Sequence, residues 1–275
     1  MSIITIARGL FSSGQALAEQ VAAMLGYRCM SRELLLEAVT RYEIPEARFT
    51  ELLETSPEVT PIRPENLRLY RIVLQAAMCE MVQGGKLVYH GHGGQELLPG
   101  IQHVLKVRLL APLAYRVTQV RGRQGLDEAS AYLYIARVDA IRARRVQELF
   151  GVDWQDPRKY DLLLNLGQMS LEAAVKRVVE WAKRPEFQPT PVSEQALQDL
   201  TVKARVEAAL AVSPETRSVS LHVLAEQGTV YMWGVLPGFG VEREVLRVAE
   251  GVAGVREVVP DFRVALERVR EDAAH

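Results

Sequence analysis

The first 25 residues, MSIITIARGLFSSGQALAEQVAAML, contain a short apolar run, then a loop of small residues, then a run of helix-forming residues. Residues 3–7 are predicted to form a strand. Residues 15–25 are predicted to form a helix, because their apolar positions recur at helical spacing. A strand, a Gly/Ser loop and a helix in this order are the layout of a phosphate-binding loop, where backbone N–H groups and the helix N-terminus hold an anion. An ordinary strand-to-helix turn has the same layout.

The loop departs from the usual phosphate-binding motif. Gly9 and Gly14 have the spacing of GxxxxGK[ST], but Gln15 and Ala16 follow where a lysine and a serine or threonine are expected. A GxxxxG pair arises by chance about once in a chain of this length, so only its place between the first strand and the first helix gives it weight. The sequence therefore predicts a loop that keeps its amides but lacks the lysine for phosphate and the hydroxyl for magnesium.

The composition of the 275-residue chain is that of a folded protein with no charge bias. Hydrophobic residues make up 48% of the sequence, and the formal net charge is −1, which gives no argument for nucleic-acid binding or a polybasic membrane surface. Its two cysteines, Cys29 and Cys79, are predicted to be core residues rather than a disulfide framework. We see no signal peptide and no run long enough to span a membrane, so we expect a cytoplasmic protein.

Apolar and helical segments alternate over the first two thirds of the chain. Short apolar runs, the predicted strands, occupy residues 3–7, 87–90, 104–110 and 160–165. Helical patterns occupy residues 15–25, 31–42, 65–82, 112–121, 126–150 and 170–183. This alternation predicts an α/β domain with a parallel sheet and flanking helices, in which ligands bind beyond the carboxyl ends of the strands.

A proline-rich segment separates this pattern from a different one. Residues 184–192, RPEFQPTPV, hold three prolines and are predicted to form an extended linker. Beyond it, a helix at 200–212, a hairpin of strands at 218–225 and 229–235, a helix at 241–252 and a strand at 255–264 are expected. This αββαβ pattern predicts a small α+β domain.

Arginines and one aspartate are the candidates for phosphate chemistry, because phosphoryl transfer depends on positioning and on neutralising charge. Arg32 begins the second predicted helix, and Arg116 follows the third predicted strand. The helix at 126–150 carries Arg137, Asp139 and Arg142, and a separation of three residues lets Asp139 orient the Arg142 guanidinium. The alternative interpretation is that these residues form a charged helix face exposed to solvent, with no ligand.

The sequence HGHGG, residues 90–94, follows the second predicted strand. Two histidines two residues apart have no third metal ligand near them, so no metal site is predicted. A glycine-rich turn that approaches a ligand, with His92 as a hydrogen-bond donor, is the preferred interpretation.

Residues 1–183 resemble the cytidylate kinase-like family of P-loop proteins, relatives of the nucleoside monophosphate kinases. IITIARGLFSSGQALA resembles the family's I-T-I-S-R-x-x-G-S-G-G-R-E-I-A, and VYHGHGG its strand and G-R-G turn. VLKVRLLAPLAYR resembles V-x-V-x-x-x-A-P-x-x-x-R, and the pair Asp139 and Arg142 resembles D-x-x-R. The most specific match is GVDWQDPRKYDLLLN, residues 151–165, to G-x-D-W-x-D-P-x-x-Y-D-L-x-x-N.

The resemblance implies a P-loop nucleotide site in a domain spanning residues 1–184. The loop residues that would hold the donor phosphates are Gly9, Ser12, Ser13, Gly14 and Gln15. The residues implied for catalysis are Arg116, Asp139 and Arg142, and those implied for the acceptor are Arg32, His92 and Arg137. An active enzyme would use ATP and Mg²⁺.

This chain departs from the family pattern at several of these positions. Phe11 replaces a glycine and adds a Cβ near the phosphate path, Gln15 replaces a basic residue, and His92 replaces the arginine of G-R-G. The loss of one well-placed contact to a transition state costs on the order of 10² to 10³ in rate. We therefore expect weak or absent phosphoryl transfer, whereas nucleotide binding can survive on backbone amides.

After a linker at 185–197, residues 198–268 resemble a BON domain, a module named from bacterial envelope and nodulation proteins. The segments that carry the resemblance are EQGTV at 226–230, Gly234-Val235 and VAGVREV at 252–258. Such modules imply a membrane, protein or small-ligand partner and no catalysis. Three hypotheses remain open: a nucleotide-binding protein with a degenerate loop, an active kinase of CMP or dCMP in which another lysine or arginine replaces the missing one, and a non-catalytic scaffold.

Overall fold

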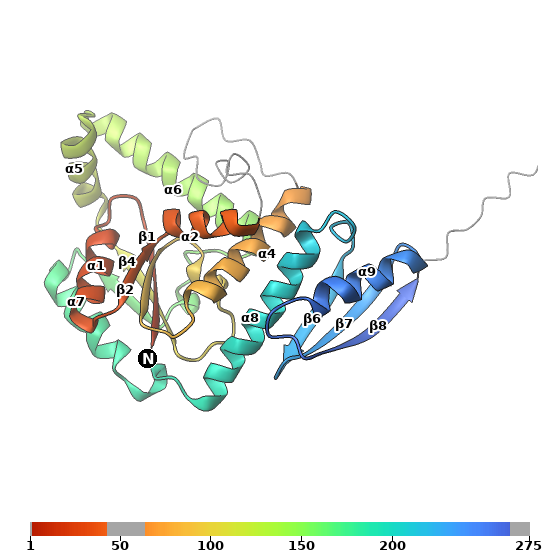
Figure 1. The fold of residues 1–275 in the computed structure, drawn as a ribbon. Coiled ribbons are helices and arrows are strands. Elements are labelled where there is room, and N and C mark those ends of the chain that lie inside the picture. The colour runs from red at the N-terminus through yellow and green to blue at the C-terminus, as the bar shows by residue number, and fades with distance from the viewer. Residues whose placement is uncertain (1, 43–63, 265–275) are drawn as a thin grey trace, which may run out of the picture. The chain divides into compact units, whose positions relative to one another are not determined.

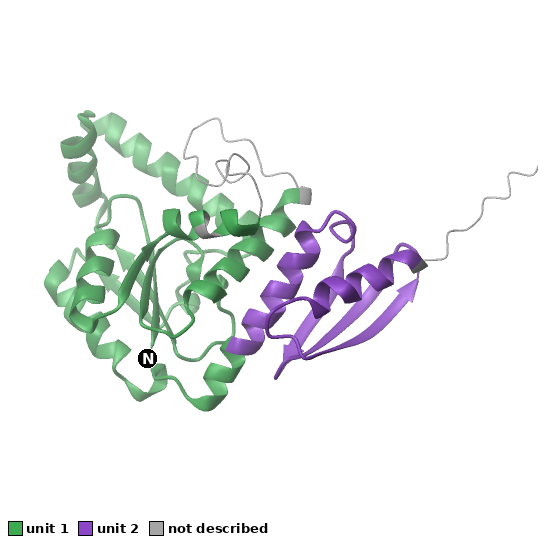
Figure 2. Ribbon diagram, in the orientation of Figure 1, with its two compact units in different colours: residues 1–197 green, residues 198–275 purple. Residues whose placement is uncertain are grey.

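The computed structural model describes residues 2–42 and 64–264, which belong to two compact units, Met1–Leu197 and Gln198–His275 (Figure 1 and Figure 2). The first unit holds a five-stranded sheet of order β2-β3-β1-β4-β5, and every neighbouring pair is parallel. Its strands are Ile3–Arg8 (β1), Arg28–Ser31 (β2), Leu87–Gly91 (β3), Val104–Leu110 (β4) and Leu162–Asn165 (β5). The predicted parallel α/β fold is confirmed.

Helices connect the strands, as the alternating pattern predicted. They are Gly14–Leu25 (α1), Arg32–Val39 (α2), Pro64–Met81 (α4), Leu113–Gln124 (α5), Glu128–Phe150 (α6) and Leu171–Ala182 (α7). Leu17 and Val21 of α1 and Val178 of α7 are fully buried in one core with Ile4 and Ile6 of β1. These two helices therefore cover the same face of the sheet, and they hold β1 and the loop after it in place.

The sequence analysis missed the strand β2. This segment, RCMS, has four residues and lies at the edge of the sheet, where it pairs only with β3. Arg28 is exposed, and Met30 is buried. A strand this short gives no readable alternation, and its pairing with a distant strand is decided by tertiary contacts. Cys29 lies on this strand and is partly buried, and Cys79 on α4 is fully buried, in agreement with their predicted core positions.

The segment predicted to be an extended linker is largely helical. Pro185–Phe187 forms a 3-10 turn (η4), and the long helix α8, Pro191–Val212, begins nine residues before its predicted start at residue 200. Pro191 occupies the first helical turn, where a missing N–H costs nothing. Thr190 and Ser193 cap the helix reciprocally, with Ser193 N–H donating to Thr190 Oγ1 at 3.1 Å and Thr190 N–H to Ser193 Oγ at 2.9 Å. The prolines therefore start this helix rather than prevent it.

The second unit has the predicted αββαβ order. The strands Leu221–Glu226 (β6), Thr229–Leu236 (β7) and Glu257–Val264 (β8) form a mixed sheet, antiparallel between β6 and β7 and parallel between β7 and β8. Val206 of α8 and Val245 and Ala249 of Phe239–Glu250 (α9) are fully buried with Val230 and Met232 of β7. The opposite face of this sheet carries exposed Leu224, Tyr231, Trp233 and Val259.

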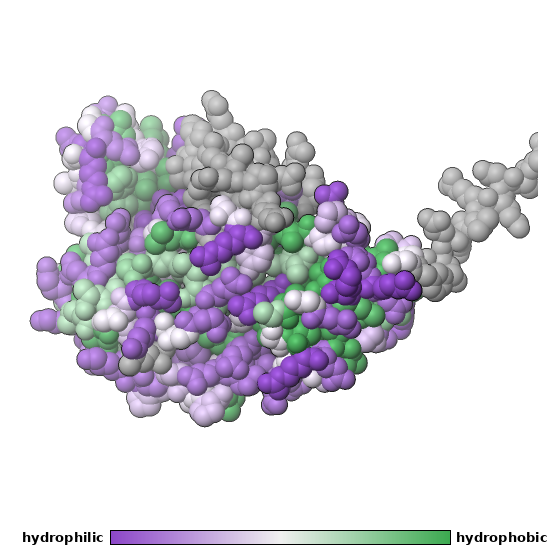
Figure 3. All heavy atoms as spheres, in the orientation of Figure 1, coloured by the Kyte–Doolittle hydropathy of each residue, from purple (hydrophilic) through white to green (hydrophobic). Residues whose placement is uncertain are grey.

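None of the helices among the described residues is long and apolar enough to cross a membrane. On the face of the molecule shown in Figure 3, hydrophilic residues are widespread and hydrophobic residues appear in smaller groups between them.

Candidate functional site

The loop after β1 adopts a conformation that normally requires glycine. Ser13, the residue before α1, has φ 60°, and Phe11 has φ 52°. The left-handed region costs a residue with a Cβ roughly 1–2 kcal/mol. Both residues stand where the family pattern G-S-G-G has glycine. The backbone therefore keeps a glycine-type path although the glycines are gone.

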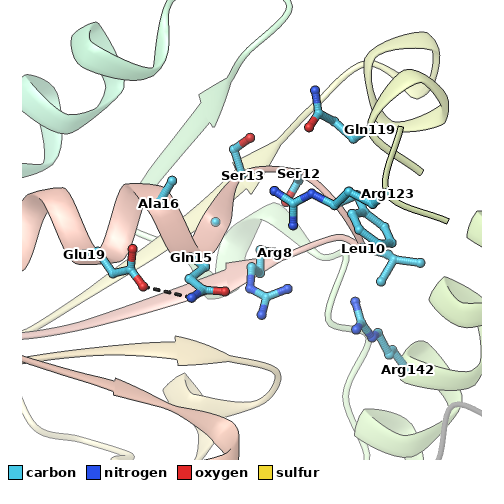
Figure 4. A pocket seen from close by; sticks show the side chains of 12 residues that line it. Arg8, Leu10, Ser12, Ser13, Gln15, Ala16, Glu19, Gln119, Arg123 and Arg142 are labelled. Atoms are coloured by element: carbon cyan, nitrogen blue, oxygen red, sulfur yellow. Dashed lines mark hydrogen bonds between the residues drawn. The ribbon is translucent and has the colours of Figure 1, made fainter. Parts of the chain in front are cut away.

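A glutamine stands at the lysine position of the motif. In GxxxxGK[ST], the lysine directly follows the last glycine, at the start of the helix. α1 begins at Gly14, the last glycine of this spacing, so Gln15 stands in the lysine position and Ala16 in the hydroxyl position. The side chain of Gln15 donates from Nε2 to Oε1 of Glu19 at 2.8 Å (Figure 4).

The amides at the helix start are available to a ligand. The N–H groups of residues 13–16 donate no hydrogen bond to any part of the chain that the structure describes. Phe11 lines the cavity beside the loop and packs against an apolar cluster that includes Val117, Val120 and Ile135 of α5 and α6. The guanidinium of Arg123 lies 5.6 Å from its ring centre. Phe11 is thus anchored to the two helices.

A cavity of about 470 Å³ lies beside this loop. Its lining consists of Arg8 at the end of β1, the loop and first turns of α1 (Leu10, Phe11, Ser12, Ser13, Gly14, Gln15, Ala16, Glu19), Gln119 and Arg123 of α5, and Arg142 of α6. Figure 4 shows the side chains of Arg8, Arg123 and Arg142 reaching toward this space from three different elements. The fold therefore brings free amides and three positive charges to one hollow.

Two of these arginines are partly buried and lack partners. Nε of Arg8 and Nε and Nη1 of Arg142 are buried without a hydrogen-bond partner among the described residues. Burial, together with the positive charges of Arg8 and Arg32, lowers the pKa of Arg142 to about 10, while Asp139 opposes the shift. Burial also lowers the pKa of Arg8. Unpaired buried guanidinium groups are costly, so this arrangement favours an anion between them.

Arg116 and Asp139 hold the loop rather than face the cavity. Arg116 Nη2 lies 2.5 Å from Asp139 Oδ2, its Nε donates to the Leu10 carbonyl at 2.7 Å, and the Leu10 N–H donates to Asp139 Oδ1 at 3.1 Å. Both polar groups of the Leu10 backbone are thus fixed by one ion pair. The expectation that Asp139 orients Arg142 is wrong, because its carboxylate is taken by Arg116 and Leu10. Neither residue lines the cavity.

The remaining predicted residues lie around the site. His92 Nε2 is 2.8 Å from the Arg8 carbonyl, and burial with the nearby charges of Arg142 and Arg8 keeps its pKa well below the usual value, so the neutral ring donates to that carbonyl. Arg32 lies 3.6 Å from Glu33 and acts on Arg8 and Arg142 through its charge. Arg137 is exposed on α6, and the structure does not bring it to the cavity.

Gly9 has a packing role. A Cβ built at Gly9 would lie 3.2 Å from Cζ of Arg116, which is tighter than usual van der Waals contact. The absence of a side chain there lets Arg116 reach Leu10. Ser12 is buried, and its hydroxyl donates to the Gly9 carbonyl at 2.9 Å. Both residues therefore stabilise the loop itself, and Ser12 lines the cavity together with Ser13, Gly14 and Gln15.

The donor set fits phosphate and does not fit Mg²⁺. Free amides and unpaired guanidinium groups are phosphate ligands. Mg²⁺ needs hard oxygen ligands, usually carboxylates. Among the described residues, no group of three or more His, Cys, Asp or Glu could hold a metal ion. Glu19 is the acidic residue in the cavity lining, and it accepts a hydrogen bond from Gln15.

The segment GVDWQDPRKYDLLLN is held by its own side chains and by Arg108 of β4. Tyr160 donates its hydroxyl hydrogen to the Trp154 carbonyl at 2.6 Å, and both rings are nearly buried. The Arg108 guanidinium lies 5.3 Å from the Trp154 ring and 5.7 Å from the Tyr160 ring, and it donates to the carbonyls of Trp154 and Gln155. Asp156 caps a 3-10 turn, Pro157–Lys159 (η3), by accepting from Arg158 N–H at 2.9 Å.

The sequence analysis did not assign Arg8, Gln119 or Arg123 to the site. Arg8 could have been found, because it directly follows the first predicted strand and matches the arginine of I-T-I-S-R in the family pattern. Gln119 and Arg123 are separated by one helical turn on α5 and gave no sequence signal beyond a charged helix. Their place at the cavity depends on how α5 packs on α6 and Phe11.

Comparison with known proteins agrees with this architecture. Residues 3–168 match the cytidylate kinase-like family, and residues 198–265 match the BON domain. The chain therefore belongs to the cytidylate kinase-like family and carries a C-terminal BON domain.

Individual relatives are distant. The cytidylate kinase of Ignicoccus hospitalis is 25% identical over 65% of this chain and 97% of its own length. A stretch of 90 residues is 35% identical to a uronate isomerase of Corynebacterium glutamicum, and the chain spans only 17% of the length of that relative. The crystal structure of an uncharacterized protein from Eubacterium ventriosum superimposes with a TM-score of 0.54 at 19% identity, over 67% of this chain and all of the other.

Proposed function

We propose that the N-terminal unit binds the phosphates of a nucleotide in the cavity beside the loop and that it transfers phosphoryl groups slowly or not at all. One observation carries the proposal: the free amides of residues 13–16 and the unpaired guanidinium groups of Arg8 and Arg142 converge on one cavity. Each of these groups binds phosphate oxygens well, and together they offer an anion both backbone and charged donors. We base slow transfer on Gln15 and Ala16, which stand where the motif has its lysine and its magnesium-binding hydroxyl.

Isothermal titration calorimetry of the full chain with ATP, ADP and CMP tests the binding. We expect at least one of them to bind, and the variant Arg142→Gln to bind it about 10- to 100-fold more weakly, since a hydrogen bond to a charged group contributes about 1.5–3 kcal/mol. The matched control Arg177→Gln removes an exposed arginine that pairs with Glu180 and does not line the cavity. If none of the three nucleotides binds, the proposal fails.

A second candidate is ATP-dependent phosphorylation of CMP or dCMP. It is favoured by one observation, the presence of Arg8 beside the position of the missing lysine. The relatives named cytidylate kinase support the same candidate. A coupled assay of ADP release with Mg²⁺ and each monophosphate separates the two. Turnover that Arg142→Gln abolishes would replace our proposal with this one.

The C-terminal BON domain has a non-catalytic role in this proposal, as a module for a protein or small-ligand partner. Its support is the uncovered apolar side chains on one sheet face and the ring of His222 stacked on Trp233, with ring centres 5.3 Å apart.

A further inference from the structure

One face of the C-terminal sheet carries a contiguous group of exposed apolar side chains. Alternate residues of β6, β7 and β8 pack on α8 and α9, so the residues between them point to the opposite side, called the exposed face below. The strand register places Leu224, Tyr231 and Val259 in one row across the three strands. Trp233, in the next row, is 40% exposed, and Val235 is 57% exposed. Contiguous apolar groups of this kind mark interaction surfaces.

The charged residues of the exposed face lie toward its two ends. Glu226 and Glu257 stand at one end, because Thr229 of β7 pairs with both of them. Arg263 stands near the other end of β8, and Asp261 lies between Glu257 and Arg263 on the same strand. All four charged residues are exposed. The face is therefore apolar in the middle, acidic at one end and basic at the opposite end of β8.

Resting on the proposed role of the BON domain as a binding module, we propose that a second copy of this chain docks on the exposed face, with its strands antiparallel to those of the first. The two-fold axis lies between the two sheets and runs across the strands. It places β8 opposite β8 of the other copy in reversed direction, so Glu257 of each copy faces Arg263 of the other. Tyr231 and Trp233 of the two copies meet in the middle. Sheets packed face to face cross at about 30°, an offset that long Glu and Arg side chains can span.

The charges favour this orientation over the other two-fold arrangement of two sheets. An axis parallel to the strands would place β6 of one copy opposite β8 of the other without reversal. Glu226 of each copy would then face Glu257 of the other, and like charges directly opposite each other are destabilising. His222 would come near Asp261, but Arg263 would have no acid opposite it. Only the antiparallel arrangement gives both copies two opposite-charge contacts.

The exposed face suits a second copy better than a polyanion. Along the described strands β6, β7 and β8, this face holds three carboxylates and one guanidinium, which would repel an anionic membrane or a nucleic-acid strand. Three strands about 4.8 Å apart and about eight residues long cover on the order of 400 Å². A standard interface buries about 800 Å² per partner, so the dimer is weak and depends on concentration.

Sedimentation velocity of the full chain over a range of concentrations tests the proposal. We expect a monomer–dimer equilibrium with a dissociation constant of about 10–100 µM. Glu257→Arg brings two guanidinium groups together at each end of the interface, and Arg263→Glu brings two carboxylates together. Each variant should raise the dissociation constant at least about 10-fold. Glu250→Arg, which changes an exposed charge on α9 behind the sheet, is the matched control and should leave the constant unchanged.

Restoring the charge pairs gives the sharpest test. The double variant Glu257→Arg with Arg263→Glu should dimerise like the wild type, and an equimolar mixture of the two single variants should form a heterodimer, because both arrangements place opposite charges face to face again. If the single variants are unfolded by circular dichroism, Trp233→Ser replaces them. This variant removes an exposed ring from the middle of the face and should raise the dissociation constant at least about 10-fold.

The other outcomes overturn the inference. A dimer that no variant of the exposed face weakens is built on another surface, and a dimer that Glu257→Arg strengthens has its axis parallel to the strands. A chain that stays monomeric but binds vesicles of phosphatidylcholine and phosphatidylglycerol uses a membrane instead of a second copy. Calorimetry with nucleotides keeps the two proposals apart. A monomer that binds a nucleotide overturns this inference and leaves the proposed nucleotide site intact, whereas a dimer that binds none does the reverse.

Discussion

Two segments at the ends of strands in the same sheet contrast sharply: the loop after β1, residues 8–16, and the segment 151–165 that leads into β5. In the second, Tyr160 donates to the Trp154 carbonyl, Arg108 lies over both rings, and Asp156 accepts from Arg158. In the first, amides and guanidinium atoms have no partner among the described residues. The family resemblance is strongest in the segment whose polar groups, apart from Trp154 Nε1, are mostly bound within the protein, and that segment maintains the fold. The loop, where the resemblance is weakest, keeps the groups that a ligand would satisfy.

The largest change in stability is expected in residues 151–165, the segment that leads into β5. Trp154→Ala removes a side chain that is 4% exposed and contacts both Arg108 and His92, so we expect the free energy of unfolding to fall by about 3–5 kcal/mol. Denaturation by urea measures the change. Leu163→Ala, at a position 43% exposed in the same segment, serves as the control and should cost far less. If both variants lose the same amount of unfolding free energy, the buried contacts of Trp154 do not stabilise residues 151–165.

An intermediate change in stability is expected at the ion pair of Arg116 and Asp139, which holds the backbone of Leu10 in the loop after β1. Arg116→Met removes the donor to the Leu10 carbonyl and leaves Asp139 without its cation, so a loss of about 2 kcal/mol is expected. Asp139→Asn should cost a similar amount, and the double variant should cost clearly less than the sum, because one network is broken in each case. Arg121→Met, which breaks a more exposed pair with Glu128 at 3.8 Å, is the control. If the losses of unfolding free energy measured in urea are additive, Arg116 and Asp139 do not act on the Leu10 backbone as one network.

The smallest expected effect concerns the strained backbone of the loop. Ser13→Ala and Ser13→Gly both remove the hydroxyl that lies 2.6 Å from the Tyr115 hydroxyl, but only glycine relieves the cost of φ 60°. Ser13→Gly should therefore be more stable than Ser13→Ala by about 0.5–1 kcal/mol, after the greater chain entropy of glycine in the unfolded state is deducted. Differential melting of the two variants measures it. An alanine variant as stable as the glycine variant would show that the loop is not strained.

Much of the fold could be predicted because it depends on local patterns. The continuous apolar run of β1 and the helical spacing of α1 were sufficient for the strand, loop and helix, and GVDWQDPRKYDLLLN was sufficient for the family. The prediction was wrong where local rules allow two outcomes. The prolines at 185–191 suggested an extended chain, but Pro191 fits the first turn of α8 because Thr190 and Ser193 cap it.

The site was predicted less well than the fold, since pairing between side chains depends on distance in space. Spacing on α6 suggested that Asp139 serves Arg142, but Asp139 meets Arg116, 23 residues earlier in the chain. Arg8 was overlooked although it matches the family's I-T-I-S-R, because nothing in the sequence indicates that its side chain lies against Gly14. The prediction that the loop keeps its amides free could only be examined once the position of the helix start was known.

The sequence by itself determined the parallel α/β unit, the αββαβ unit after it and the missing loop lysine, because periodicity, turn residues and residue identity are properties of the chain. Only the tertiary structure decided which charges remain unpaired at the loop. A guanidinium is neutralised or left free by whatever the packing of β1, α5 and α6 places within a few ångströms of it. That packing gives Arg116 to Asp139 and leaves Arg8 and Arg142 facing the cavity.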